Sequence, residues 1–157
     1  MNRKLAMNLK SINLNRKKLL KFVWIASVLS LIGLADSIYL TIHHYTARSV
    51  PCSIVEGCEK VLTSQYATFW GIPIAIFGAI SYLFALIWSV LASFGKTLFW
   101  YVFLFQTSLM AAYSVWLVYL QWFVIESFCQ FCLLSAFVCF TLFFVALISI
   151  FVSRQNF

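Results

Sequence analysis

The chain has 157 residues, of which 64% are hydrophobic and 10% charged, and its mean hydropathy is +0.97. A soluble domain carries about 25% charged residues, so this composition excludes a water-soluble globular fold and places the chain in a lipid bilayer. The net charge of +7 does not indicate nucleic acid, because seven of the 11 basic residues precede the first apolar run: Arg3, Lys4, Lys10, Arg16, Lys17, Lys18 and Lys21.

Four apolar runs are each long enough to cross a bilayer, which takes roughly 20 residues. They cover residues 22–45, 69–94, 98–125 and 128–152. The first run is too long for the core of a cleaved signal peptide, so we interpret it as a retained helix. Because the links are short, the sequence predicts an all-α integral membrane four-helix bundle at 22–152, with a basic tail at 1–21 and a short tail at 153–157.

The basic residues also predict the orientation of this bundle. Lys and Arg accumulate on the cytoplasmic side of membrane proteins, so the tail at 1–21 is expected in the cytoplasm, partly disordered and near anionic lipid heads. Four spans return the carboxyl terminus to the same side. The acidic residues Glu56, Glu59 and Glu126 fall in the links predicted to lie outside.

The first outer link, about 46–68, is the longest polar stretch between spans and carries Cys52 and Cys58. Pro51 and Gly57 predict turns around this pair, and residues 59–62 favour a short helix at the membrane surface. Compartments outside the cytoplasm permit disulfides. The pair can therefore close as a static disulfide or swing as a redox shuttle.

A second pair, Cys129 and Cys132, opens the last apolar run. Three positions apart on a helix, the two thiols share one face, and a helix N-terminus stabilises a thiolate and lowers its pKa. The alternatives are a structural disulfide or a zinc site made with Cys52 and Cys58, since zinc takes about four ligands. We favour redox chemistry and predict no metal.

The spans contain other candidate residues. Asp36 is the only acid within a span, followed on its helical face by Tyr39 and His43; it is either a proton donor or a structural hydrogen-bonding group. Cys139 has no partner in the sequence; it can border a quinone site, but we interpret it as a small apolar side chain outside the relay. The small residues Gly71, Ala75, Gly78 and Ala85 are assigned to helix packing. The polar residues of the third run either line a ligand pocket or form ordinary hydrogen bonds between helices, and we favour the second for any one of them: Gln106, Thr107, Ser108, Ser114 and Gln121.

Four segments together resemble the vitamin K epoxide reductase family, in particular its bacterial branch. They are Cys52-Ser-Ile, Cys58-Glu-Lys-Val-Leu-Thr-Ser64, Phe69-Trp-Gly-Ile-Pro73 and Cys129-Gln-Phe-Cys132-Leu-Leu-Ser-Ala136. The resemblance covers residues 22–152. It implies that Cys132 lies nearest a quinone, that Cys129 exchanges with Cys58, that Cys52 meets an external partner, and that Ser64 helps to bind the quinone.

The resemblance also implies a reaction. Such enzymes oxidise a thioredoxin-like protein and pass the electrons to ubiquinone or menaquinone, which supports disulfide bond formation. This chain carries no fused thioredoxin-like domain, so a separate periplasmic or extracellular partner of the DsbA type is expected, with the enzyme in the bacterial cytoplasmic (inner) membrane. Ile74 and Ala136 stand where vertebrate members use polar residues to bind vitamin K, so a quinone is preferred to the epoxide.

Two other interpretations remain. The DsbB family also has four spans and two cysteine pairs, but its Cys-x-x-Cys pair belongs to the first outer loop, whereas here that spacing opens the fourth run. A non-catalytic membrane scaffold or small transporter with structural disulfides is the alternative from a different class. It predicts that loss of Cys129 or Cys132 lowers stability and leaves thiol oxidation intact.

Overall fold

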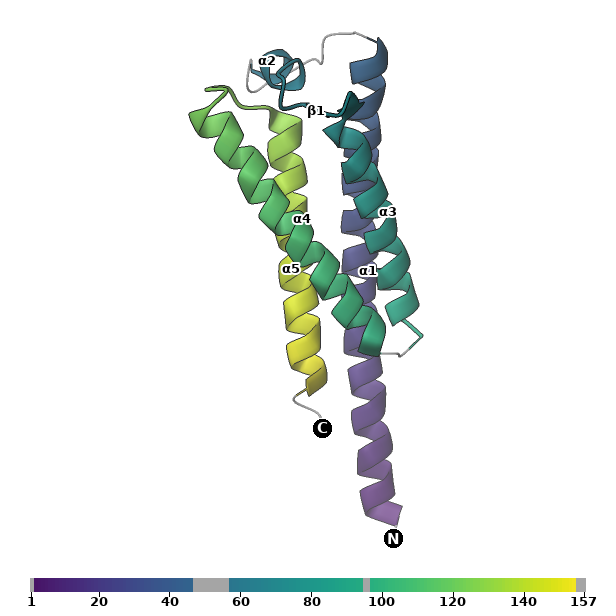
Figure 1. Ribbon diagram of the computed structural model, residues 1–157. Coiled ribbons are helices and arrows are strands. Elements are labelled where there is room, and N and C mark those ends of the chain that lie inside the picture. The colour runs from purple at the N-terminus through teal and green to yellow at the C-terminus, as the bar shows by residue number, and fades with distance from the viewer. Residues whose placement is uncertain (1, 47–56, 95–96, 155–157) are drawn as a thin grey trace.

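The computed structural model describes residues 2–46, 57–94 and 97–154 (Figure 1). Its elements are four long helices, one short helix and a two-stranded hairpin. In chain order they are α1 (Asn2–Thr46), α2 (Cys58–Leu62), β1 (Thr68–Phe69), β2 (Ile72–Pro73), α3 (Ile74–Ala92), α4 (Thr97–Phe123) and α5 (Gln130–Arg154). The predicted all-α bundle is confirmed, and so is the short helix of the outer link.

The four long helices contain candidate membrane spans at Leu20–Thr46, Ile74–Ala92, Leu98–Phe123 and Gln130–Phe151. Helix α1 packs on α3 and α5, and α4 packs on the same two helices. Figure 1 shows α4 running obliquely across the others. We call the end that carries α2 and the hairpin the loop end, and the end where α1 begins and α5 ends the terminal end.

Helix α1 begins at Asn2 and so includes the basic segment before the first span. Residues 2–21 contain neither Gly nor Pro and are rich in Lys, Leu and Arg, which favour a helix once a neighbouring turn is formed. The membrane span supplies that turn. The partial disorder expected for this segment stays a prediction.

The second span begins later than the run at 69–94 predicted. Thr68 pairs with Pro73 and Phe69 with Ile72 in an antiparallel hairpin, and α3 starts at Ile74. The turn between the strands needs positive φ at Trp70 (51°) and Gly71 (78°), a conformation that glycine adopts without steric cost. Gly71 belongs to this turn and not to the helix-packing stripe assigned to it.

Close contacts of small residues hold α1 against α3. Gly33 packs so tightly on the ring of Tyr82 that a Cβ atom there would overlap it, and a Cβ on Gly78 would lie 3.0 Å from Ser37 Oγ. Ala85 is fully buried. The packing role predicted for Gly78 and Ala85 is confirmed, because small residues allow helices to approach closely.

Candidate redox site

Cys129 lies immediately before α5, whose first residue is Gln130. Its carbonyl accepts the first helical hydrogen bond, from the N–H of Leu133 at 3.0 Å. The backbone N–H groups of Phe131 and Cys132 favour the charged form of its sulfur. Cys129 thus occupies the N-cap position, where the N–H groups of the first helical turn have no partner within the helix. The sequence placed Cys129 inside the last run, but it is the residue that caps it.

These contacts change the acidity of Cys129. The hydrogen bond from the Cys132 thiol is the largest cause that lowers the pKa of Cys129 to about 7, from its ordinary value of 9.0, and the backbone N–H groups act in the same direction. Burial and the charge of Asp36 oppose the shift. The lowered pKa favours the thiolate of Cys129, the form that attacks disulfides.

Gln121, from the end of α4, fixes the backbone of Cys129. Its side-chain oxygen accepts a hydrogen bond from the Cys129 N–H at 2.9 Å, and the two residues are 2% and 0% exposed. A buried N–H without a partner costs about 1–3 kcal/mol, so this contact is strongly constraining. The sequence predicted Gln121 as a packing or pocket-lining residue, and it does border the cavity at this end of the bundle; its bond to Cys129 was missed because nothing in its spacing connects the two.

The loop cysteine Cys58 lies beside this thiol. It is 1% exposed and shares a buried cluster with Val61 and Cys129. A Cβ atom on the preceding Gly57 would lie 2.7 Å from the carbonyl oxygen of Phe128, so the start of α2 rests directly on the segment before α5. Cys58 is disulfide-bonded, whereas Cys129, Cys132 and Cys139 are free thiols. The predicted site residue Cys52 lies outside the described residues.

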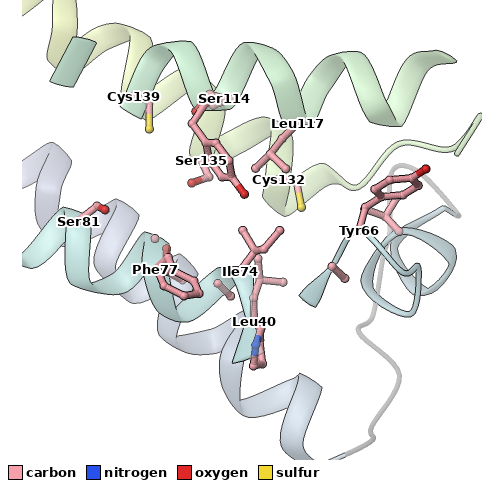
Figure 2. A pocket seen from close by; sticks show the side chains of 18 of the residues that line it. Leu40, Tyr66, Ile74, Phe77, Ser81, Ser114, Leu117, Cys132, Ser135 and Cys139 are labelled. Atoms are coloured by element: carbon pink, nitrogen blue, oxygen red, sulfur yellow. The ribbon is translucent and has the colours of Figure 1, made fainter. Parts of the chain in front are cut away.

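An apolar cavity of about 380 Å³ lies between the helices at the loop end. Figure 2 shows Cys132, Leu117 and Ser135 on one side of it and Leu40, Ile74 and Phe77 on the other, with Tyr66 near the loop. Its volume falls within the range typical of small-molecule sites. Cys132 is only partly buried and borders the cavity, whereas its neighbour Cys129 is fully buried and does not line it.

Ser64 also lines this cavity. Its hydroxyl donates to the carbonyl oxygen of Val61 at 2.7 Å and closes the turn after α2. Ile74 and Ala136, the positions at which the resemblance departs from vertebrate members, border the same space. The structure therefore brings Ser64, Cys132 and both departing positions around one cavity.

A hydrogen-bonded group lies deeper in the cavity and centres on Tyr82 of α3. The Tyr82 hydroxyl donates to the carbonyl oxygen of Ser135 at 2.8 Å and lies 3.1 Å from the sulfur of Cys139. Ser114 of α4 lines the same part of the cavity. Sequence reasoning missed Tyr82, since its partners are more than 50 residues away. Cys139, which the sequence allowed at the border of a quinone site, lines the cavity.

Metal binding finds no support in the part of the chain that the structure describes. There, no group of three or more His, Cys, Asp or Glu side chains could hold a metal ion. The zinc alternative also used Cys52, which lies outside this part.

The fold and the site define a class before any comparison is made: a multi-pass membrane protein with free thiols between a disulfide-bonded loop and an apolar cavity. The family model described as the Vitamin K epoxide reductase family matches residues 24–147, well over half of the chain. The chain belongs to this family, and the predicted resemblance is confirmed. It is accordingly a membrane redox enzyme.

Proposed function

We propose that the protein is a quinone-dependent thiol-disulfide oxidoreductase that oxidises a thioredoxin-like partner and passes the electrons to a membrane quinone. One observation carries this proposal: the two thiols one helical turn apart face different neighbours. Cys129 lies against the loop cysteine Cys58, and Cys132 borders the apolar cavity. A pair placed in this way can take electrons on one side and deliver them on the other.

The proposed relay has two thiol-disulfide exchanges before the quinone. A dithiol of the partner reduces a disulfide between Cys52 and Cys58, with Cys52 meeting the partner. Cys58 then attacks Cys129 in a Cys129–Cys132 disulfide, and closure of the loop disulfide leaves the second pair reduced. Each exchange breaks one S–S bond and forms another. A disulfide-bonded Cys58 beside free Cys129 and Cys132 fits the moment when two electrons have reached the pair at the cavity.

The cavity fits a quinone head group. Its walls are largely apolar, it is roomy enough for a ring, and it lies within the part of the bundle that spans the bilayer. We assign Cys132 as the electron donor to the ring and Ser64 as a hydroxyl that holds or polarises a quinone oxygen once it turns away from Val61. Family members generally use quinones, and ubiquinone and menaquinone are both candidates.

We infer the orientation from charge. The basic residues of α1 lie at the terminal end, so both termini are proposed to face the cytoplasm and the loop end to face the periplasm or the outside. This places the thiols in an oxidising compartment. The partner is then a separate DsbA-type protein that docks at the loop end, and the enzyme resides in a bacterial inner membrane.

The scaffold or transporter alternative is disfavoured by the state of the second pair. A structural role for this second pair requires a bond between Cys129 and Cys132, but both are free thiols and the pKa of Cys129 is lowered. Nothing in that alternative requires a thiol with a lowered pKa beside a second cysteine.

Trapping experiments test the order of exchange. In the Cys132→Ala variant, Cys129 has no resolving thiol, so we expect a stable Cys58–Cys129 mixed disulfide in alkylated peptides analysed by mass spectrometry. The Cys129→Ala variant should lack it, and Cys139→Ala serves as a control with both pairs intact. A trapped Cys52–Cys129 bond would overturn the assigned order.

A further inference from the structure

Asp36 of α1 is a buried acid that the relay leaves unused. The residue is 8% exposed, and its Oδ2 atom is fully buried without a hydrogen-bond partner in the described parts of the chain. Burying an unpaired carboxylate in a membrane bundle costs several kcal/mol unless it can take up a proton. A side chain whose charged form is unfavourable to bury and whose protonated form is not is suited to carry a proton.

The contacts of neighbouring residues place Asp36 beside the thiol pair. One turn toward the loop end, the ring of Tyr39 lies 5.1 Å from that of Phe131, the residue before Cys132. One turn the other way, Gly33 packs on the ring of Tyr82. The carboxyl therefore lies on α1 between its contact with the start of α5 and the Tyr82 group.

The titratable groups around Asp36 come from three elements. Tyr82 approaches from α3, and Cys129 and Cys132 from the start of α5; all three interact electrostatically with the carboxyl. On α1 itself, Tyr39 and His43 follow toward the loop end, their rings 4.4 Å apart. The hydroxyl of Tyr82 is already bonded to Ser135. Within the described residues, Asp36 Oδ2 is the buried oxygen of this set that has no hydrogen-bond partner.

We propose that Asp36 accepts the proton of the Cys132 thiol when the Cys129–Cys132 pair is oxidised, and delivers it to a quinone oxygen. This inference rests on the proposed function. Both S–H bonds are lost, an S–S bond forms, and two electrons pass to the quinone. Asp36 carries the Cys132 proton to one oxygen. The Cys129 proton leaves to the solution at the loop end, and an equivalent proton from the solution completes the second O–H bond.

The Asp36→Asn variant keeps the shape of the side chain and removes its ability to take a proton. In a single-turnover assay with the reduced protein and a soluble quinone analogue, we expect reduction to slow by about 10²-fold, the usual effect of losing a general base. Asp36→Glu should recover much of the rate. Ser30→Ala is the matched control and should react like wild type, because Ser30 is a second fully buried polar side chain of α1 with no hydrogen-bond partner among the described residues.

A second readout needs no quinone. Removal of the Asp36 charge takes away a group that opposes the Cys129 thiolate, so the ultraviolet absorbance of the thiolate should appear at lower pH in Asp36→Asn. The variant should thus ionise more readily and yet reduce quinone more slowly. A purely structural role for Asp36 does not predict easier thiolate formation together with slower quinone reduction.

The outcomes separate the inference from the proposed function. If Asp36→Asn reduces quinone at the wild-type rate, or if thiolate formation and quinone reduction are impaired together, the role of Asp36 is overturned and the relay stands. If the wild-type protein reduces no quinone, the proposed function and the inference both fall.

Discussion

The two ends of the bundle are built from the same four helices in different ways. At the terminal end, small side chains such as Ala26, Ala92 and Ala146 are fully buried, and Ser27 of α1 meets Ser89 of α3 at 3.1 Å. At the loop end, the helices enclose a cavity of about 380 Å³ bordered by Cys132. The comparison suggests that tight packing at one end fixes the helices so that the other end can hold an open, reactive site.

The largest loss of activity is expected for a substitution of Cys129 at the loop end. The Cys129→Ala variant removes the thiol that links Cys58 to Cys132, so partner-dependent quinone reduction should fall to background. Thr141→Ala in α5, outside the cavity lining and with its hydroxyl on the Phe137 carbonyl, is expected to retain the relay. The two rates are compared with a reduced thioredoxin-like donor; equal activities in both variants would show that Cys129 is not an exchange residue.

The lowered pKa of Cys129 distinguishes it from Cys132, the other thiol of the pair. Its pKa is lowered to about 7, chiefly by the hydrogen bond from Cys132, and the thiolate is its ionised form. The thiolate absorbance assigned by subtracting a Cys129→Ser spectrum should therefore decline as pH falls through about 7, and its pH dependence should move upward in Cys132→Ala. A midpoint unchanged by loss of Cys132 would contradict the assigned cause.

Gln121 tests whether α4 positions the reactive segment. Gln121→Leu leaves the buried N–H of Cys129 without an acceptor, which should lower the free energy of unfolding by about 1–3 kcal/mol and slow the exchange with Cys58. Ser108→Ala is the control, since the Ser108 hydroxyl bonds only its own helix, at Leu104; surface-like changes of this kind stay within about 0.5 kcal/mol. A similar decrease in the free energy of unfolding and in the exchange rate in both variants would show that Gln121 does not position Cys129.

Gly33 tests the packing of α1 on α3, where we expect the smallest effect on the redox chemistry. A Cβ in Gly33→Ala overlaps the Tyr82 ring, so we expect about 1–3 kcal/mol of destabilisation from overpacking. Gly78→Ala is milder, because its Cβ meets only the Ser37 side chain, at 3.0 and 3.7 Å. Thermal unfolding in detergent measures the stability of both variants. A Gly33→Ala protein as stable as Gly78→Ala would show that the Tyr82 ring can move to accommodate the added methyl group.

The spans and the thiol pairs were accessible from the sequence, since hydropathy over about 20 residues and cysteine spacing are local signals. The start of α3 was missed because a hairpin with two-residue strands has no periodicity to detect. The contacts of Gln121 with Cys129 and of Tyr82 with Ser135 depend on how α4 and α3 meet α5. No single-sequence pattern records such an encounter.

Likewise, the start of α5 was predictable to within two residues, but the N-cap position of Cys129 was not. Whether a thiol lies inside the first turn or accepts hydrogen bonds from that turn depends on backbone geometry at the junction, where Glu126 adopts a φ of 50°. A positive φ at a glutamate cannot be predicted from composition. Nor can the contact of Gly57 with Phe128, which lies 71 residues further along the chain.

The central claim is that electrons leave the protein through Cys132. Its most direct test is a quinone-reduction assay on the purified protein with a reduced thioredoxin-like donor, run in parallel on Cys132→Ala. The account predicts that the wild-type protein reduces the quinone and that the variant does not, while accumulating the Cys58–Cys129 bond. Continued quinone reduction by Cys132→Ala with the same donor would contradict it.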